Sequence, residues 1–311
     1  MRPLKNPILR LQRLTLDGET TVRLATTGLL PADLRRLDDE AAHRLRAAGF
    51  VGCSCFFPDP TAPTPIELDR LRDTLRRAGV GVAQVNGRYE TLVNPDEGLR
   101  RQGIAALQAA VQVCRRLRGD NLYVRPGSLN PGGHWWPHPE NHSPATIDRL
   151  VDSLRQVATV AEDAGVTLAV EGHTVSPLDT PALVREVIDR VGSPALKFNC
   201  DPVNFVSNVQ DVYHSRRVLD ALFDTLGDVT WAVHAKDMAL EDRHVVHISE
   251  VVMGRGRMDL GYMLLRFQAA RPEGYVIVEH LPDELIPEAR DALLAAGAEV
   301  GITWHDHPHT Y

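Results

Sequence analysis

Four polar residues stand at the ends of four apolar runs, and their side-chain types could together bind a metal ion. Glu171 lies in TLAVEGH, Asp201 in ALKFNCD, His234 in VTWAVHAKD and Glu279 in GYVIVEHL. Such apolar runs are typical of buried parallel strands, where a charged group is costly unless it is paired. Three carboxylates and one imidazole suit Mn²⁺, Mg²⁺ or Co²⁺, whereas zinc sites more often use additional histidine or cysteine ligands. We therefore predict a divalent metal site that favours Mn²⁺, with Mg²⁺, Co²⁺ or Zn²⁺ as alternatives.

The positions of these four residues along the chain support their convergence on one point. Side chains alternate between the two faces of a strand, so Leu168 and Val170 take one face and Ala169 shares the other with Glu171. The face that ends in the polar residue is expected to point into the barrel. The intervals from Glu171 to Asp201 and from Asp201 to His234 are each about one strand–helix unit. The longer interval to Glu279 contains a long connection. The alternative is that the four are unrelated buried ion pairs or surface residues.

The elements that must position these residues are strands and helices in alternation. Strands are predicted at 22–28, 50–57, 81–89, 121–128, 167–173, 195–201, 229–237 and 275–281. Amphipathic helices are predicted at 32–48, 65–78, 98–118, 144–165, 180–191, 211–226, 259–271 and 283–297. Eight strand–helix units make the α/β fold of a (β/α)8 TIM barrel. A doubly wound open sheet is the alternative, but no GxGxxG motif follows the first strand.

The composition indicates one ordinary globular domain. No linker divides the 311 residues, so we predict a single barrel domain at 21–298, an N-terminal extension at 1–20 and a C-terminal tail at 299–311. The net charge of −7 argues against nucleic acid as a partner. No run approaches the roughly 18 apolar residues of a membrane span. Four cysteines, expected to be buried free thiols, and the lack of a signal peptide predict a cytoplasmic location.

Two long connections follow predicted strands, on the side where a barrel places its active site. They are residues 128–143 and 238–258. The first contains Trp135, Trp136 and His138 and is a candidate lid over a polar substrate. The alternative is that its tryptophans only pack the loop onto the barrel. The predicted substrate-binding residues are Lys236, Asn204, Arg125, Trp135, Trp136 and His138.

Several short motifs resemble one family of enzymes. The segments VEGH, NCDPVN, HAKD, Gly254-x-Gly256-x-x-Asp259 and IVEH are similar to those of the xylose isomerase-like TIM barrels, the sugar phosphate isomerase/epimerase superfamily. This group includes ketose 3-epimerases, hydroxypyruvate isomerase, inosose dehydratase and the endonuclease IV nucleases. The resemblance covers about residues 20–297. The HAKD segment and His173, two residues after the first glutamate, resemble the inosose dehydratase-like branch.

The resemblance implies a metal held by Glu171, Asp201, His234 and Glu279. It also implies that the two glutamates act as acid and base on opposite faces of a bound sugar. One departure from the ketose 3-epimerases is the segment after Asp201, where those enzymes have DxxH and this chain has DPVN. Asn204 can hydrogen-bond a hydroxyl group but cannot transfer a proton at neutral pH.

The predicted reaction begins with proton abstraction next to a metal-bound carbonyl, which gives an enediolate. Glu171, Glu279 and His173 are the predicted catalytic residues, and His173 has a second interpretation as a partner that orients Glu171. Reprotonation makes the protein an isomerase or epimerase of a small sugar or polyol, which is the leading hypothesis. Loss of a β-substituent makes it a lyase, either an inosose-type dehydratase or a β-eliminase that deglycosylates 3-oxo-C-glycosides.

Two further function classes fit the sequence less well. A nuclease of the endonuclease IV type needs extra histidine ligands and a basic groove, and the net charge of −7 disfavours it. A non-catalytic sugar-binding barrel would not need a four-ligand metal cage. The sequence leaves open whether the protein forms a homo- or hetero-oligomer.

Overall fold

Eight parallel strands close into a barrel in the computed structural model, which describes residues 21–309. The strands are β1 (Thr21–Thr26), β2 (Gly52–Phe57), β3 (Gly81–Gly87), β4 (Leu122–Val124), β5 (Leu168–Glu171), β6 (Leu196–Cys200), β7 (Thr230–Ala235) and β10 (Tyr275–Val278). They pair in this order, and pairing of β10 with β1 closes the ring. The predicted (β/α)8 barrel is therefore confirmed. The predicted N-terminal extension, residues 1–20, lies outside the described residues.

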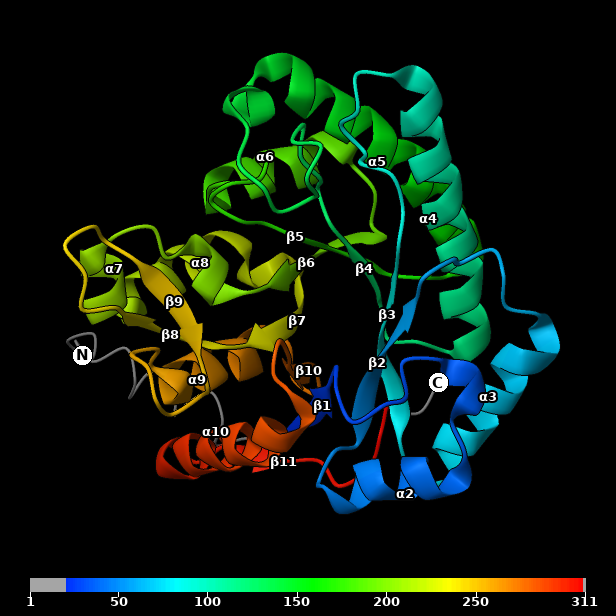
Figure 1. The fold of residues 1–311 in the computed structure, drawn as a ribbon, viewed down its shortest axis with the longest axis vertical. Coiled ribbons are helices and arrows are strands. Elements are labelled where there is room, and N and C mark those ends of the chain that lie inside the picture. The colour runs from blue at the N-terminus through cyan, green and yellow to red at the C-terminus, as the bar shows by residue number, and fades with distance from the viewer. Residues whose placement is uncertain (1–20, 310–311) are drawn as a thin grey trace, which may run out of the picture.

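Helices surround the barrel on its outer side (Figure 1). They are α2 (Asp39–Ala47), α3 (Pro65–Arg77), α4 (Glu97–Leu117), α5 (Pro144–Ala164), α6 (Pro181–Val191), α7 (Val209–Tyr213), α8 (Ser215–Leu226), α9 (Leu260–Ala270) and α10 (Ile286–Val300). Local sequence sets several of their ends. Thr64 and Glu67 form a reciprocal capping box at the start of α3, and Gly165 ends α5 in a left-handed conformation.

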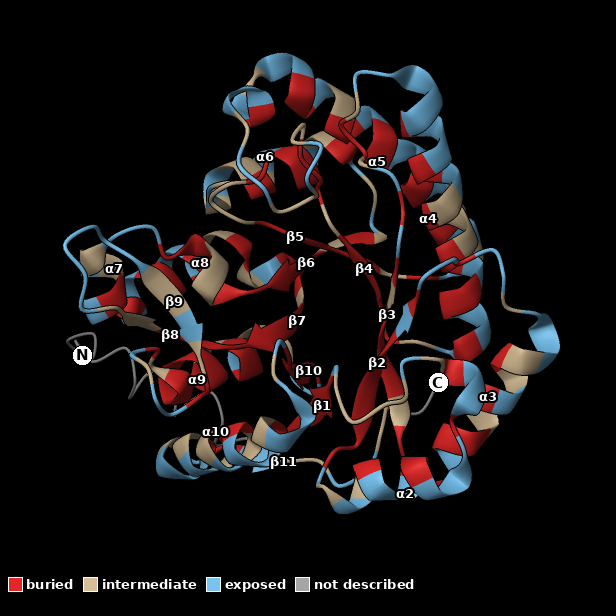
Figure 2. Ribbon diagram, viewed as in Figure 1, coloured by how far each residue is buried: buried red, intermediate tan, exposed pale blue. Residues whose placement is uncertain are grey.

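The core has two parts because the eight barrel strands bury residues on both of their faces. The larger part lies between the strands and the inner faces of the helices, and the outer faces of the helices are exposed (Figure 2). The smaller part fills the barrel interior with Ala25, Val51, Ala83, Ala232, Tyr275 and Ile277. Other inward positions carry the buried amides of Gln84, Asn121 and Asn199. The barrel is thus a packed interior that carries polar groups beside its apolar filling.

The connection after β7 is an ordered hairpin, whereas the sequence predicted only a long loop. Strands β8 (Asp237–Leu240) and β9 (Ile248–Val251) pair in antiparallel fashion, and they lie beside α7 (Figure 1). The buried carboxylate of Asp237 accepts hydrogen bonds at 2.8–3.0 Å from the backbone N–H groups of Met238, Gly254, Gly256 and Met258. A side chain at position 256 would collide with that carboxylate. The glycine turn of the sequence motif therefore wraps around Asp237 and ties the hairpin to the barrel.

Residues after α10 return to the opposite end of the barrel. Strand β11 (Thr303–Trp304) pairs with β1, and the backbone N–H of His309 donates to the Tyr275 hydroxyl at 3.0 Å. This segment, predicted as a tail, therefore packs at the N-terminal ends of the strands. The four cysteines are buried and free, as predicted. None of the helices in residues 21–309 is long and apolar enough to span a membrane.

Candidate metal centre

The structure brings together the four residues that the sequence singles out as ligands. Glu171 ends β5, Asp201 directly follows β6, His234 lies in β7 and Glu279 directly follows β10. These strands are consecutive neighbours in the sheet, so their carboxyl ends meet at one side of the barrel mouth. One potential ligand atom from each residue lies within 4.8 Å of the other three. All four side chains are buried, and Asp201 has no exposed surface.

Lys236 lies among these carboxylates. Its Nζ is 2.6 Å from Asp201 Oδ2 and 2.8 Å from Glu279 Oε1. Burial works to lower the pKa of Lys236, but Asp201 and Glu279 outweigh burial and raise it well above its usual value. Burial raises the pKa of Asp201 to about 7 even though Lys236 opposes the shift. The sequence predicts Lys236 as a substrate contact. In the structure it contacts two residues of the buried cluster, Asp201 and Glu279.

The imidazole of His234 is oriented by a buried glutamine. Its Nε2 lies 3.0 Å from Gln84 Oε1. The amide nitrogen of Gln84 donates to Asn121 and Asn199 at 3.0 and 3.1 Å, which assigns its oxygen as the acceptor toward His234. Nε2 of His234 therefore carries a proton, and Nδ1 faces the carboxylates of Glu171 and Glu279 at 3.1 Å from each.

The donor set fits a divalent cation. Nδ1 of His234 and Oδ1 of Asp201 are buried and have no hydrogen-bond partner within residues 21–309. Burial lowers the pKa of His234, but Glu279 and Glu171 outweigh burial and raise it to about 10. If a metal ion takes the place of the Nδ1 proton of His234, the three carboxylates and Lys236 leave a net charge of two negative units, which a divalent ion would balance. Three oxygen donors and one nitrogen donor are typical ligands of Mn²⁺, Mg²⁺ and related ions.

Residues that the sequence analysis missed hold Glu171 in place. The hydroxyl of Tyr123 donates to Glu171 Oε2, and the amide of Asn199 donates to Oε1 at 3.1 Å. Burial and the nearby Glu171 raise the pKa of Tyr123 well above its usual value, so it stays a donor. The sequence held a signal for these residues, because a polar side chain at an inward position of an otherwise apolar strand needs a partner. Such positions are Gln84, Tyr123 and Asn199.

The loop between β4 and α5 covers one side of the site. The ring of Trp135 lies 5.7 Å from that of His173, centroid to centroid. Asn141, which the sequence analysis did not single out, anchors the loop. Its Nδ2 donates to Ser128 Oγ at 3.0 Å and to the backbone oxygen of Val175 at 2.8 Å. The loop is therefore fastened to the segment that follows Glu171.

The other predicted substrate contacts occupy different surroundings. Trp136 is exposed, and His138 accepts a hydrogen bond from the backbone of Glu140 at the start of a short 3-10 helix. Asn204 lies in the 3-10 helix Pro202–Phe205 directly after Asp201. Arg125 follows β4 at the barrel mouth. Contact of any of these residues with a substrate stays a prediction.

His173 has a defined tautomer when it is neutral. Its Nδ1 accepts a hydrogen bond from the backbone N–H of Val175 at 3.1 Å. Burial lowers its pKa, although Glu171 opposes the shift. A neutral ring whose Nδ1 lone pair is used in this way carries its proton on Nε2. His173 can then donate a hydrogen bond from Nε2 but cannot accept a proton there.

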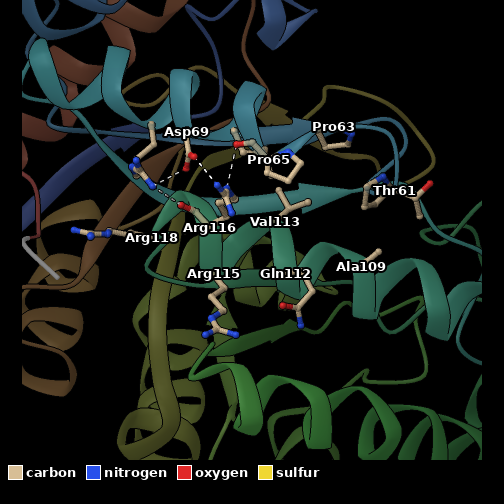
Figure 3. Close-up of a pocket in the computed structure, with 13 residues that line it drawn as sticks. Thr61, Pro63, Pro65, Asp69, Ala109, Gln112, Val113, Arg115, Arg116 and Arg118 are labelled. Atoms are coloured by element: carbon tan, nitrogen blue, oxygen red, sulfur yellow. Dashed lines mark hydrogen bonds and ion pairs between the residues drawn. The ribbon is translucent and has the colours of Figure 1, made fainter.

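A large groove lies elsewhere on the molecule, on the outer side of the barrel between α3 and α4 (Figure 3). Its volume is about 840 Å³ and it is rich in arginine. Asp69 pairs there with Arg72 at 3.0 Å and with Arg116 at 2.5 Å. These surface ion pairs belong to helix–helix packing, and the groove is separate from the buried cluster at the strand ends.

Comparison with known proteins agrees with this architecture. A family model described as "Xylose isomerase-like TIM barrel" matches residues 42–300. A search of the curated proteins finds no match to this sequence. Solved structures do show similarity, at 14–17% sequence identity for the three described next.

A xylose isomerase-like TIM barrel protein from Mycobacterium smegmatis, in complex with magnesium, is 14% identical with a TM-score of 0.68, and the match covers 90% of this chain and 97% of that one. The apo form of 3-keto-D-glucoside 4-epimerase from E. coli is 17% identical with a TM-score of 0.66, covering 89% and 100%. D-Psicose 3-epimerase from Clostridium cellulolyticum H10, in a structure with D-tagatose, is 15% identical with a TM-score of 0.68, covering 90% and 100%.

At this level of identity the structural similarity shows a shared fold, and the family model shows the relationship. The matched region runs from α2 to the end of α10 and includes all four residues of the buried cluster. The resemblance found in the sequence motifs is confirmed at the level of the family. This chain belongs to the xylose isomerase-like TIM barrel family.

Proposed function

We propose that this protein is a divalent-metal-dependent isomerase or epimerase that acts on a small sugar or polyol. The observation that carries the proposal is the buried cluster of Glu171, Asp201, His234 and Glu279 at the carboxyl ends of adjacent strands. In a (β/α)8 barrel this end of the strands carries the active site. Two of the similar structures are sugar epimerases by description, which agrees with this reaction class.

The four clustered residues would hold the cation, and Mn²⁺ is the ion that we favour. A similar structure described as a complex with magnesium agrees with a divalent ion in this fold. When bound, the ion would polarise a substrate carbonyl and make the neighbouring C–H group more acidic. The protein's part is to exclude water, to orient the sugar and to move protons at that carbon.

Glu171 and Glu279 are the proposed acid–base pair. They belong to strands on either side of His234, whose Nδ1 is equally distant from a carboxylate oxygen of each. Tyr123 and Asn199 hold Glu171 by one hydrogen bond to each oxygen, so its carboxylate has a fixed plane. One glutamate would remove the proton from carbon, and the other would return a proton from the opposite side of the sugar.

His173 would act as a hydrogen-bond donor instead of the base that the sequence suggested as one of two roles. Because its Nδ1 accepts from Val175, its Nε2–H is the group available to a substrate oxygen. The ring of Trp135 packs beside it and limits access of water from that side. This donor would stabilise negative charge that develops on the substrate oxygen.

A lyase reaction is the second candidate, and the same donor favours it. Glu171 or Glu279, protonated after it removes the carbon-bound proton, could pass that proton to a departing β-substituent, as a dehydratase or a β-eliminase for 3-oxo-C-glycosides requires. The Nε2–H of neutral His173 could hydrogen-bond the same group as it leaves. Asn204 at the position where ketose 3-epimerases carry a histidine is consistent with this alternative. It would place the protein in the inosose dehydratase-like branch of the family.

The experiment combines metal analysis with deuterium exchange. The purified protein, loaded with Mn²⁺, is incubated in D₂O with a panel of ketoses and keto-inositols. Deuterium at the carbon next to the carbonyl, with the sugar recovered intact, supports the isomerase; a dehydrated or aglycone product supports the lyase. The variants Glu171→Gln and Glu279→Gln should lose exchange by more than about 1,000-fold. We expect both to lose metal as well.

The matched control is Glu299→Gln on the exposed side of α10, which should keep wild-type exchange and metal content. Full exchange activity in either site variant would contradict the roles proposed for the glutamates. Absence of exchange and of elimination across the panel, with the metal bound, would contradict the proposed function as a whole.

A further inference from the structure

Arg125 occupies a fixed position at the barrel mouth next to the metal centre. It follows β4 two residues after Tyr123, so both side chains lie on the inward face. Its Nη1 donates to Asn86 Oδ1 at 2.9 Å, and its Nη2 donates to the backbone oxygen of Gly87. The guanidinium carbon lies 4.7 Å from the ring centroid of Tyr89 and 5.9 Å from that of Tyr123.

All of these partners are electrically neutral. Within residues 21–309, no carboxylate forms an ion pair with Arg125. The other arginines with little exposed side chain differ. Arg100 pairs with Glu97 and Asp152, and Arg266 pairs with Asp220 and Asp224. A half-buried guanidinium without a counter-charge is unfavourable by itself, and it is a strong binding group for an anion.

The charges of the metal centre balance one another, so the positive charge of Arg125 has no negative partner there. Glu171, Asp201 and Glu279 supply three negative charges, and Lys236 with a divalent ion supplies three positive charges. Glu250 at the rim lies 3.2 Å from His280 Nδ1. No acidic group of the metal centre therefore remains to neutralise Arg125.

The position of Arg125 also sets where an anion would lie. Tyr123 stands between the guanidinium and the metal centre, because its ring faces Arg125 and its hydroxyl binds Glu171. An anionic group at Arg125 would be separated from a metal-bound carbonyl by about the width of one ring. That separation suits the two ends of one sugar molecule better than two adjacent atoms.

We propose that the substrate is a sugar with an anionic group, a carboxylate or a phosphate, and that Arg125 binds this group while the metal centre binds the reacting carbonyl end. The inference rests on the proposed function, because it takes the reacting end to be held by the metal. The planar fork of the guanidinium can bind two oxygens of either group at once. Asn86, Gly87 and Tyr89 hold the fork in place before the substrate arrives.

The test compares matched neutral and anionic ligands on the same protein. The Mn²⁺-loaded wild type, Arg125→Met and Arg125→Lys are titrated by calorimetry with 2-ketohexoses, with their 6-phosphates and with their 6-carboxylates. The wild type should bind one anionic set at least about 10-fold more tightly than the neutral set. Arg125→Met should weaken that binding about 100-fold and change neutral ligands less than about 3-fold, because a charged hydrogen-bond pair is lost. The affinity of Arg125→Lys for the anionic ligands should lie between those of the wild type and Arg125→Met.

The phosphate and carboxylate arms identify which anion the site accepts. Arg217→Met, which removes an exposed arginine on α8, is the control for the change in net charge and should behave as wild type. Equal wild-type affinity for neutral and anionic ligands would overturn the inference. So would anion binding that Arg125→Met leaves unchanged.

Deuterium exchange on the same panel separates the two claims. Binding of anions that depends on Arg125, without exchange or elimination on any ligand, would keep the anion site and reject the proposed reaction. Exchange on neutral ketoses that Arg125→Met does not reduce, with no preference for anions, would keep the reaction and reject the anion site.

Discussion

At the barrel mouth, some residues belong to the buried cluster that would bind the metal, and others hold the cluster side chains in position. Gln84 belongs to the second group. Its amide oxygen accepts a hydrogen bond from the Nε2–H of His234, and its amide nitrogen donates to Asn121 and Asn199. Because this bond leaves Nδ1 as the nitrogen that faces the carboxylates, the glutamine determines which nitrogen of His234 is offered to a metal.

Replacement of Gln84 should weaken the metal site without changing any residue that touches the ion. We expect Gln84→Leu to raise the Kd for Mn²⁺ by about 10- to 100-fold, because the imidazole loses the partner that fixes its tautomer. Titration of the apo protein by calorimetry or electron paramagnetic resonance measures this. Gln108→Leu, a half-buried glutamine on α4, is the control. A folded Gln84→Leu protein with an unchanged Kd would contradict the positioning role.

His134 in the loop over the site should make stability depend on pH. Its Nε2 lies 3.0 Å from the backbone oxygen of Tyr89, and its buried Nδ1 has no partner within residues 21–309. Burial and the nearby Arg125 lower the pKa of His134 from 6.5 to about 4. As the pH falls from 6.5 toward 4, the unfolded chain binds a proton at this residue and the folded chain does not, so stability falls.

The variant His134→Gln removes that titration and should flatten the pH dependence. Between pH 7 and pH 5, the wild type should lose about 1–2 kcal/mol more of its free energy of unfolding than His134→Gln does. Urea unfolding at several pH values measures the difference. The exposed His43, replaced by glutamine in the same way, serves as the control. Parallel pH profiles for wild type and His134→Gln would show that this histidine is not held neutral.

At the scale of elements, the hairpin β8–β9 depends on one carboxylate. Asp237 accepts four backbone hydrogen bonds from residues 238–258, and β9 carries Glu250 to 3.8 Å from Lys236 at the metal centre. The hairpin therefore links the glycine turn to the rim of the site.

The variant Asp237→Asn should destabilise the fold. The asparagine amide nitrogen would face backbone N–H groups that need an acceptor, and two or more charge-assisted bonds would be lost, at a cost of about 3 kcal/mol. Urea unfolding measures the cost, and Asp242→Asn at the exposed tip of the hairpin is the matched control. Equal stability of the two variants would mean that the turn does not need the charge.

Strands and helices could be predicted from the sequence because each one has a local signature. Apolar runs with a polar end residue marked the barrel strands, and glycines after amphipathic segments marked several helix ends. The hairpin was missed because Asp237 acts on residues up to 21 positions away, through contacts that no local pattern records. The hydrogen bonds of the Gln84 amide were missed for the same reason, since His234 and Gln84 are 150 residues apart in the sequence.

In the predicted lid, too, the sequence indicates one important residue and gives no sign of another. Trp135 could be singled out because a large ring in a polar loop is conspicuous, and it does contact His173. Asn141 looked like an ordinary loop residue, yet it is fully buried and fastens the loop to Ser128 and Val175. A polar residue's partners are set by the closed barrel, so its role appears only when the whole chain is folded.

At the scale of the whole molecule, closure of the barrel makes the site. Pairing of β10 with β1 and with β7 brings Glu279 beside residues from β5 to β7, far earlier in the chain. The outer helices bury the opposite faces of the strands and so hold the ring closed. A cluster of three carboxylates can persist there because the fold supplies Lys236 and a place for a divalent ion.

The most direct measurement is anomalous diffraction from a crystal of the Mn²⁺-loaded protein. We expect one strong manganese peak within bonding distance of carboxylate oxygens of Glu171, Asp201 and Glu279 and of Nδ1 of His234. A peak that lies elsewhere, or a fully soaked crystal in which these four side chains surround no metal, would contradict it.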